Sequence, residues 1–118
     1  MKKFLAVYMG SKNSASGKRW EALDAETKKK KEAAGMEGWK KWGMASGKAI
    51  VEMGCPLGKT KKIGPEGISD IKNEIVAYTV VQAETHEAAA KLFINHPHFA
   101  IFPGDSVEMM ECLSIPGM

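Results

Sequence analysis

Two segments of this chain have the pattern of strands that are apolar on both faces, and this feature limits the possible folds more than any other. The apolar side chains of residues 3–9 and 74–84 are Phe4, Ala6 and Tyr8 opposite Leu5, Val7 and Met9, and Val76, Tyr78 and Val80 opposite Ile75, Ala77 and Val81. A sheet surface that faces water alternates apolar with polar side chains. Both faces of these strands therefore need to be covered in the folded protein.

The other elements predict an α+β fold with one domain over residues 1–118. Residues 18–46 are helical in composition, and Gly35 and Gly38 predict either two helical pieces or one helix with a weak joint near Gly35. A second helix over 86–95 begins at the N-cap Thr85 and ends before Pro97, and a last strand covers 106–113. The Gly- and Pro-rich stretch 48–73 is the least regular and holds one short strand near 60–63. This order predicts a ferredoxin-like, split β-α-β arrangement, in which an antiparallel sheet carries helices on one face.

Helices on one face leave the second apolar face of the sheet open. Monomeric proteins rarely expose an apolar patch larger than a few hundred Å². A second copy of the chain, packed sheet against sheet, would cover that face. We therefore expect a homodimer that forms through the sheet face and has two-fold symmetry.

The composition argues against several classes of protein. The net charge is only +3, from 17 basic and 14 acidic residues, and the run 28–31 (KKKK) contains no aromatic residue, so we expect no nucleic-acid partner. No apolar run reaches the roughly 18–20 residues of a membrane span, and we expect no membrane partner and a cytoplasmic location. No nucleotide or flavin fingerprint occurs, so we expect no cofactor. Cys55 and Cys112 lack the C-x-x-C spacing of zinc or redox motifs, which predicts two isolated buried thiols.

His96 is the strongest candidate for a catalytic residue. It follows Ala89, Leu92 and Phe93 at helical spacing, which predicts that its ring continues the buried face of the second helix. A histidine there can move a proton near neutral pH, but it can equally cap the helix, lie in the core or bind a metal. Asp70 is the candidate catalytic partner if the 48–73 stretch folds over the end of this helix; otherwise it is a turn or cap residue.

Three further side chains are candidates for binding a ligand. His98 follows His96 in a His-x-His pattern that could aim two rings at one metal ion, but no third ligand has a fixed spacing, so we predict no metal site. Trp39 and Tyr8 would form an aromatic wall; alternatively they belong to the core or the dimer interface, and His98 is a plain loop residue. We expect His96, assisted by Asp70, to face a small pocket bounded by the 48–73 stretch and an aromatic residue of the first helix.

Six stretches of the sequence form a series that covers nearly the whole chain. They are residues 1–8 (MKKFLAVY), 35–42 (GMEGWKKW), 54–57 (GCPL), 77–89 (AYTVVQAETHEAA), 96–98 (HPH) and 115–118 (IPGM). In this order they resemble YCII-related proteins, the group also called DGPF-domain proteins. The resemblance implies a ferredoxin-like domain that pairs into a dimeric α/β-barrel. It also implies a site made of a histidine on the first helix and an aspartate before a proline; this chain has Met36 and His96 near those positions.

The resemblance also implies a class of function. One branch of the family is associated with dehydrochlorination of a chlorinated hydroxyquinol. We expect a protein that binds a small molecule and catalyses a proton-transfer or a lyase- or hydrolase-like reaction. The alternative is a dimeric module with a structural or regulatory role and no catalysis.

Overall fold

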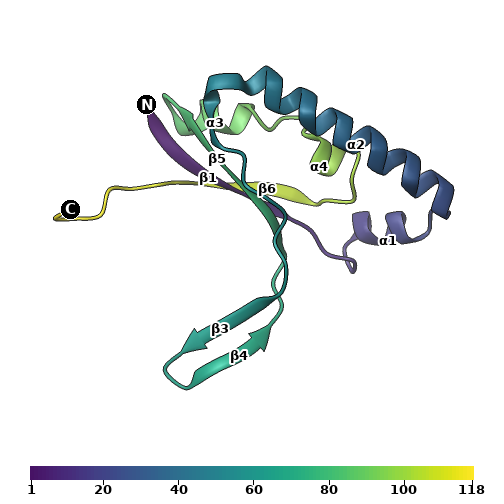
Figure 1. The fold of residues 1–118 in the computed structure, drawn as a ribbon, viewed down its shortest axis with the longest axis horizontal. Coiled ribbons are helices and arrows are strands. Elements are labelled where there is room, and N and C mark those ends of the chain that lie inside the picture. Colours follow the sequence, from purple (N-terminus) through teal and green to yellow (C-terminus); the bar gives the residue numbers. More distant parts are fainter.

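The computed structural model describes all 118 residues and shows one four-stranded antiparallel sheet and a separate hairpin (Figure 1). The sheet contains β1 (Lys2–Met9), β2 (Ile50–Glu52), β5 (Ile75–Ala83) and β6 (Ser106–Glu111), in the order β2-β5-β1-β6. The N-terminal strand thus lies inside the sheet, between β5 and β6. The predicted α+β class with an antiparallel sheet is confirmed, as are the strands expected at residues 3–9, 74–84 and 106–113.

All the helices lie on one side of this sheet (Figure 1). They are α1 (Ala15–Glu21), α2 (Ala25–Ser46), a 3₁₀ turn (Gly47–Ala49), α3 (His86–Lys91) and α4 (Pro97–Ala100). The core forms between α2, α3 and the sheet, where Trp39 and Trp42 pack against Phe4, Tyr8 and Phe93. The molecule measures 54 × 43 × 19 Å along its principal axes.

The opposite face of the sheet is the open face, defined here by Leu5, Val7, Tyr78, Val80 and Met110. The strand register places these residues together, because Leu5 pairs with Val80 and Met110 and Val7 pairs with Tyr78. They alternate with the core residues of the same strands and therefore point away from the helices. No helix of the chain covers this face (Figure 1).

The break in the first helical segment lies elsewhere than predicted. Helix α2 runs without interruption through Gly35, and the break between α1 and α2 falls at Asp24, whose side chain accepts a hydrogen bond from the backbone N–H of Thr27 (3.0 Å). Gly35 has a packing role instead, because a Cβ atom there would lie 2.4 Å from the ring of Phe102. The glycine allows that ring to approach the helix backbone.

The stretch 48–73 is more regular than predicted. The short strand expected near residues 60–63 is confirmed as β3 (Thr60–Gly64), but β3 also pairs with β4 (Gly67–Ile71), and β2 belongs to the main sheet. Pro65 and Glu66 form the two-residue connection of the hairpin, and Gly67 follows with a φ of 112°. This hairpin, residues 60–71, is called the arm below; it extends away from the helices as a separate projection (Figure 1).

The second helical segment is shorter than the predicted 86–95. Thr85 is the N-cap as expected and accepts a hydrogen bond from the N–H of Ala88 (3.0 Å), but α3 ends at Lys91. Asn95 has a φ of 58°, and His96 then becomes the N-cap of the new helix α4, whose first residue is Pro97. His96 therefore does not continue the face of α3.

Cys55 and Cys112 are both exposed, so the prediction of buried thiols is wrong; Cys55 lies along the outer side of β5, and Cys112 follows the end of β6. No helix is long and apolar enough to cross a membrane.

Candidate functional site

Six aromatic and imidazole rings pack together between α2 and the sheet. This ring cluster consists of Tyr8, Trp39, Trp42, Phe93, His96 and His98. The ring centroid of Tyr8, from the central strand β1, lies 5.0 Å from that of Trp39 and 5.2 Å from each histidine ring. The cluster therefore places both sequence-predicted histidines beside both sequence-predicted aromatic residues.

His96 is the buried member of the histidine pair, with 0% of its surface exposed. Its Nδ1 accepts a hydrogen bond from the backbone N–H of His98 (3.0 Å), so the proton of the neutral ring is on Nε2. Nε2 has no hydrogen-bond partner, and the rings of Trp39 and Trp42 lie 4.5 Å away, centroid to centroid. Burial, with a smaller contribution from His98, lowers the pKa of His96 to about 4, so the ring is neutral at pH 7.

Tyr8 is held in a fixed hydrogen-bonded chain. The hydroxyl of Thr79 donates to the carbonyl of Met53 (2.8 Å), so the Tyr8 hydroxyl must donate to Thr79 Oγ1 (2.8 Å). Burial raises the pKa of Tyr8 to about 12, although the hydrogen bond with Thr79 acts in the opposite direction. Tyr8 therefore stays protonated, and its ring packs against those of Trp39, His96 and His98.

His98 has the chemistry that a proton-transfer residue requires. Its Nε2 lies 2.8 Å from the carbonyl oxygen of Met9 and must donate to it, since a carbonyl only accepts. In the neutral ring Nδ1 then carries a free lone pair, and no donor of the chain is bonded to it. Burial lowers the pKa of His98, while the carbonyls of Met9 and Ser106 and the charge of Asp105 oppose that shift. The neutral, basic form is therefore favoured.

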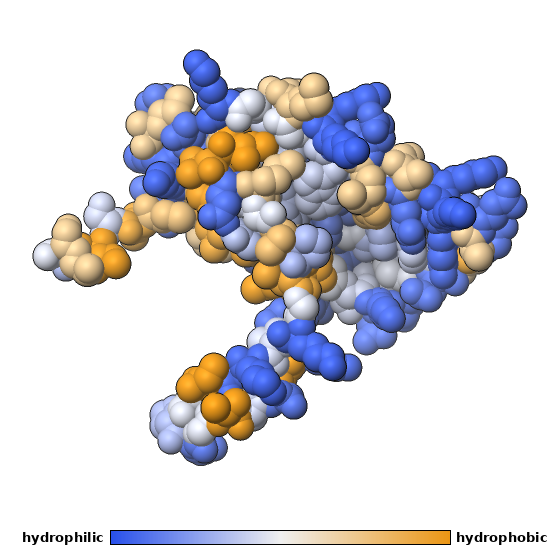
Figure 2. Space-filling model, in the orientation of Figure 1, coloured by the Kyte–Doolittle hydropathy of each residue, from blue (hydrophilic) through white to orange (hydrophobic).

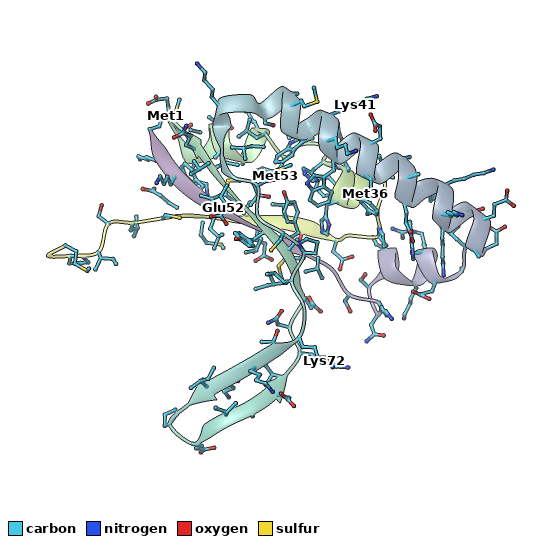
Figure 3. The ribbon with its side chains drawn as sticks, viewed as in Figure 1. Met1, Met36, Lys41, Glu52, Met53 and Lys72 are labelled. Carbon is cyan, nitrogen blue, oxygen red and sulfur yellow. The ribbon has the colours of Figure 1, made fainter.

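A cavity of about 460 Å³ lies next to His98 and is lined mainly by apolar side chains. We call it the site cavity. Its walls come from α2, from residues 53–56, from β5 and from the chain around α4: Met36, Trp39, Lys40, Met53, Gly54, Cys55, Pro56, Val76, Ala77, Tyr78, His98 and Phe102. Figure 3 shows Met36 on the helix and Met53 beyond the end of β2. A second cavity of about 430 Å³ shares Val76, His98 and Phe102 with it, so His98 lies at the boundary of the two.

The wall formed by residues 53–56 is fixed by its contacts with β5. Cys55 accepts a hydrogen bond from the N–H of Tyr78 (3.4 Å), and Leu57 donates to the carbonyl of Val76 (2.8 Å). Gly54 has a φ of 75°, and a Cβ atom at this position would lie 1.8 Å from the carbonyl oxygen of Tyr78. Only glycine allows the wall to lie this close to the strand.

Tyr78 and Glu52 form a hydrogen-bonded pair on the outer side of this wall. The hydroxyl of Tyr78 donates to Glu52 Oε2. This bond and the negative charge of Glu52 raise the pKa of Tyr78. Tyr78 therefore stays protonated, and its hydroxyl is held by Glu52 on the open face of the sheet.

The structure brings some of the predicted site residues together and separates others. His98 and Trp39 line the same cavity, and its boundary includes the 48–73 stretch and an aromatic residue of the first helical segment, as expected. Tyr8 contacts both of them but does not line the cavity. His96 does not line the cavity either, so the prediction that it faces the pocket is wrong; it is fully buried and serves as a helix cap.

Asp70 does not meet His96. It lies on the arm, and its carboxylate accepts a hydrogen bond from the ammonium group of Lys61 on the neighbouring strand (2.7 Å). Residues 60–71, which include Asp70, form a hairpin that leaves the body of the molecule, so this part of the 48–73 stretch does not fold over the histidines (Figure 1). The expected His96–Asp70 pair is therefore wrong.

Several lining residues were not singled out from the sequence as site residues, among them Met53 and Phe102. The available signal was the stretch Gly54–Pro56, where Gly and Pro mark an irregular backbone at the end of a short strand. No three His, Cys, Asp or Glu side chains lie together in a group that could hold a metal ion. A comparison with models of protein families and a comparison with curated protein sequences both found no match.

Proposed function

We propose that the chain binds a small organic molecule in the site cavity and that His98 exchanges a proton with it. The observation that carries this proposal is the position of His98 at the boundary of two cavities, with Nε2 bound to Met9 and Nδ1 free. A base needs an unprotonated nitrogen that faces its substrate and a partner that fixes the tautomer. The lowered pKa supplies the neutral form at pH 7.

The surrounding residues support this role without taking part in the proton transfer. His96 accepts from the backbone N–H of His98 and so positions the start of α4, while Tyr8 and Trp39 pack against the rings. Gly104 has no side chain, and a Cβ atom there would lie 2.3 Å from His98 Nε2. The mainly apolar lining favours an aromatic or otherwise apolar substrate with one acidic proton.

The binding proposal can be tested by thermal unfolding with a panel of small phenols, aromatic acids and ketones. A compound that binds the native state stabilises it. We expect stabilisation by at least one compound, its loss in His98→Gln, and its retention in His86→Gln, where the replaced ring is exposed and bonded to Met109. Equal stabilisation of the two variants over pH 5 to 8 would contradict a role for His98.

We also propose that the chain forms a homodimer through the open face, as a ferredoxin-like dimeric barrel of the YCII-related kind. The strand order β2-β5-β1-β6 and the helices on one face support this architecture. Val80→Lys should convert the dimer to a monomer, because the new charge would be buried in the interface. Met44→Lys is the control, since Met44 is an exposed apolar residue of α2 away from that face. A stable monomer of the unmodified protein at micromolar concentration, measured by light scattering, would refute the dimer.

The second candidate function is a dimeric module without catalysis. The cap role of His96 and the separation of Asp70 from the histidines favour it. The two functions differ in whether the chain binds a small-molecule ligand. A non-catalytic module of structural role would show no ligand-dependent stabilisation with the compound panel, and His98→Gln would then affect stability alone.

A further inference from the structure

The arm lacks support from the rest of the chain. Of its two strands, only Thr60 and Gly64 are even partly buried. A two-stranded hairpin by itself is at best marginally stable in water. An arm of this length therefore needs a surface to pack against.

One face of the arm has the composition of a docking surface. The paired residues Ile63 and Ile68 lie on it and are 74% and 71% exposed, and the Lys61–Asp70 ion pair lies beside them on the same face. The other face carries Lys62, Ser69 and Ile71. Figure 2 shows hydrophobic surface at the tip of the arm, separate from that on the body. An exposed cross-strand Ile pair beside polar groups is typical of a contact surface with a polar rim.

The size of the exposed surface supports a second copy of this chain as the partner. A compact protein of 12.8 kDa exposes about 6,300 Å², whereas this chain exposes 8453 Å². The difference, about 2,200 Å² per chain, is the area that one partner buries in an obligate homodimer. The radius of gyration of 16.2 Å likewise exceeds the roughly 13.5 Å of a compact chain of this length. The chain thus has the surface of one half of a dimer.

We propose that the arm packs the Ile63–Ile68 face onto a second copy of this chain, outside the contact between the two open faces. This proposal rests on the homodimer proposed above and adds a second contact to it. The arm extends away from the helices, so its contact lies beyond the edge of the sheet (Figure 1). In a two-fold dimer each arm packs on the other copy, and every arm residue contributes twice.

The test compares Ile68→Lys with Ser69→Lys in the full chain. Both positions are exposed on β4 and receive the same new charge, but they lie on opposite faces of the arm. Ile68→Lys should raise the dimer Kd at least about a hundredfold, because an apolar side chain is lost from the interface twice. Ser69→Lys should leave the Kd within a few-fold of the wild-type value. Analytical ultracentrifugation at several concentrations gives both values.

Hydrogen exchange provides a readout that does not depend on a variant. Amides of residues 60–71 in the wild-type chain should be protected at concentrations where the dimer forms and unprotected where it dissociates. Equal exchange of these amides in both states would overturn the proposal. So would an unchanged Kd for Ile68→Lys, or an equal loss of affinity in Ile68→Lys and Ser69→Lys.

The outcomes also separate this proposal from the one on which it rests. A dimer that Val80→Lys dissociates and Ile68→Lys does not would leave the sheet-face interface in place and remove the arm contact. A wild-type chain that stays monomeric would overturn both. An arm that is protected in a monomer, by packing on its own chain or on another molecule, would also overturn the arm contact between copies.

Discussion

His96, which is buried in the ring cluster, should make the stability of this protein depend on pH, and His96→Gln should remove its share of that dependence. His96 has its pKa lowered from 6.5 to about 4 by burial. In the unfolded chain the ring takes up a proton as the pH falls through 6.5, whereas in the folded chain it remains neutral until about pH 4. The free energy of unfolding is therefore highest above pH 6.5 and decreases between pH 6.5 and 4.

The magnitude follows from the interval between the two pKa values. The interval from 6.5 to about 4 corresponds to a loss of about 3 kcal/mol once the pH is below 4. Glutamine does not titrate, and its side-chain oxygen can accept from the backbone N–H of His98 as Nδ1 does. The variant is less stable than the wild type at pH 7, and this difference should shrink by up to about 3 kcal/mol as the pH falls to 4.

Urea unfolding at pH 7, 6, 5 and 4, at one fixed protein concentration, measures the difference between the two chains. A fixed concentration is needed because dimerisation makes the apparent stability depend on it. An NMR titration of the His96 ring measures its pKa directly. A constant difference between wild type and His96→Gln from pH 7 to 4, or a ring that titrates near 6.5, would show that the burial argument is wrong.

Three more substitutions test individual contacts. Gly104→Ala places a Cβ atom 2.3 Å from the His98 ring; it should cost about 1–3 kcal/mol and remove ligand-induced stabilisation, whereas Gly58→Ala, in open space, should keep it. Tyr8→Phe removes the hydrogen bond to Thr79 and should lower the free energy of unfolding by about 1 kcal/mol; an unchanged value in urea unfolding would contradict the bond. Asp70→Asn breaks the exposed pair with Lys61 and should change the stability by no more than about 1 kcal/mol, with no effect on ligand binding.

The central part of the fold was predictable because it follows from patterns within each segment. The alternation around Ala77 and Val81 predicts both the strand β5 and its helix-facing side, and Thr85 marks the start of α3. The joint at Gly35 was wrongly predicted because the role of that glycine depends on Phe102, which is distant in the sequence. The arm was also missed, since its Gly and Pro residues indicate irregular structure while its pairing depends on β3 and β4 together.

The candidate site was predictable in part for the same reason. The sequence predicts a pocket bounded by the 48–73 stretch and an aromatic residue of the first helix, and the cavity has both, but it predicts His96 at that pocket where the structure has His98. It does not show that Asn95 adopts a φ of 58° and turns the chain, so His96 caps a new helix instead of continuing the old one. The side chain that lines the cavity is then that of His98, two residues later. The helical spacing of apolar residues cannot predict that a single residue with a positive φ ends one helix and turns the chain into another.

The central position of β1 determines the order in which this chain can fold. Its hydrogen-bonding neighbours are β5, which begins at Ile75, and β6, which begins at Ser106. Strand β1 therefore has no partner until residues 75–83 have been synthesised and keeps one free edge until residues 106–111 follow, and its contacts join distant parts of the sequence. Such pairing closes long loops and slows folding. During that time, a segment that is apolar on both faces is available to other chains, so growing polypeptides of this protein should depend on chaperones to avoid aggregation.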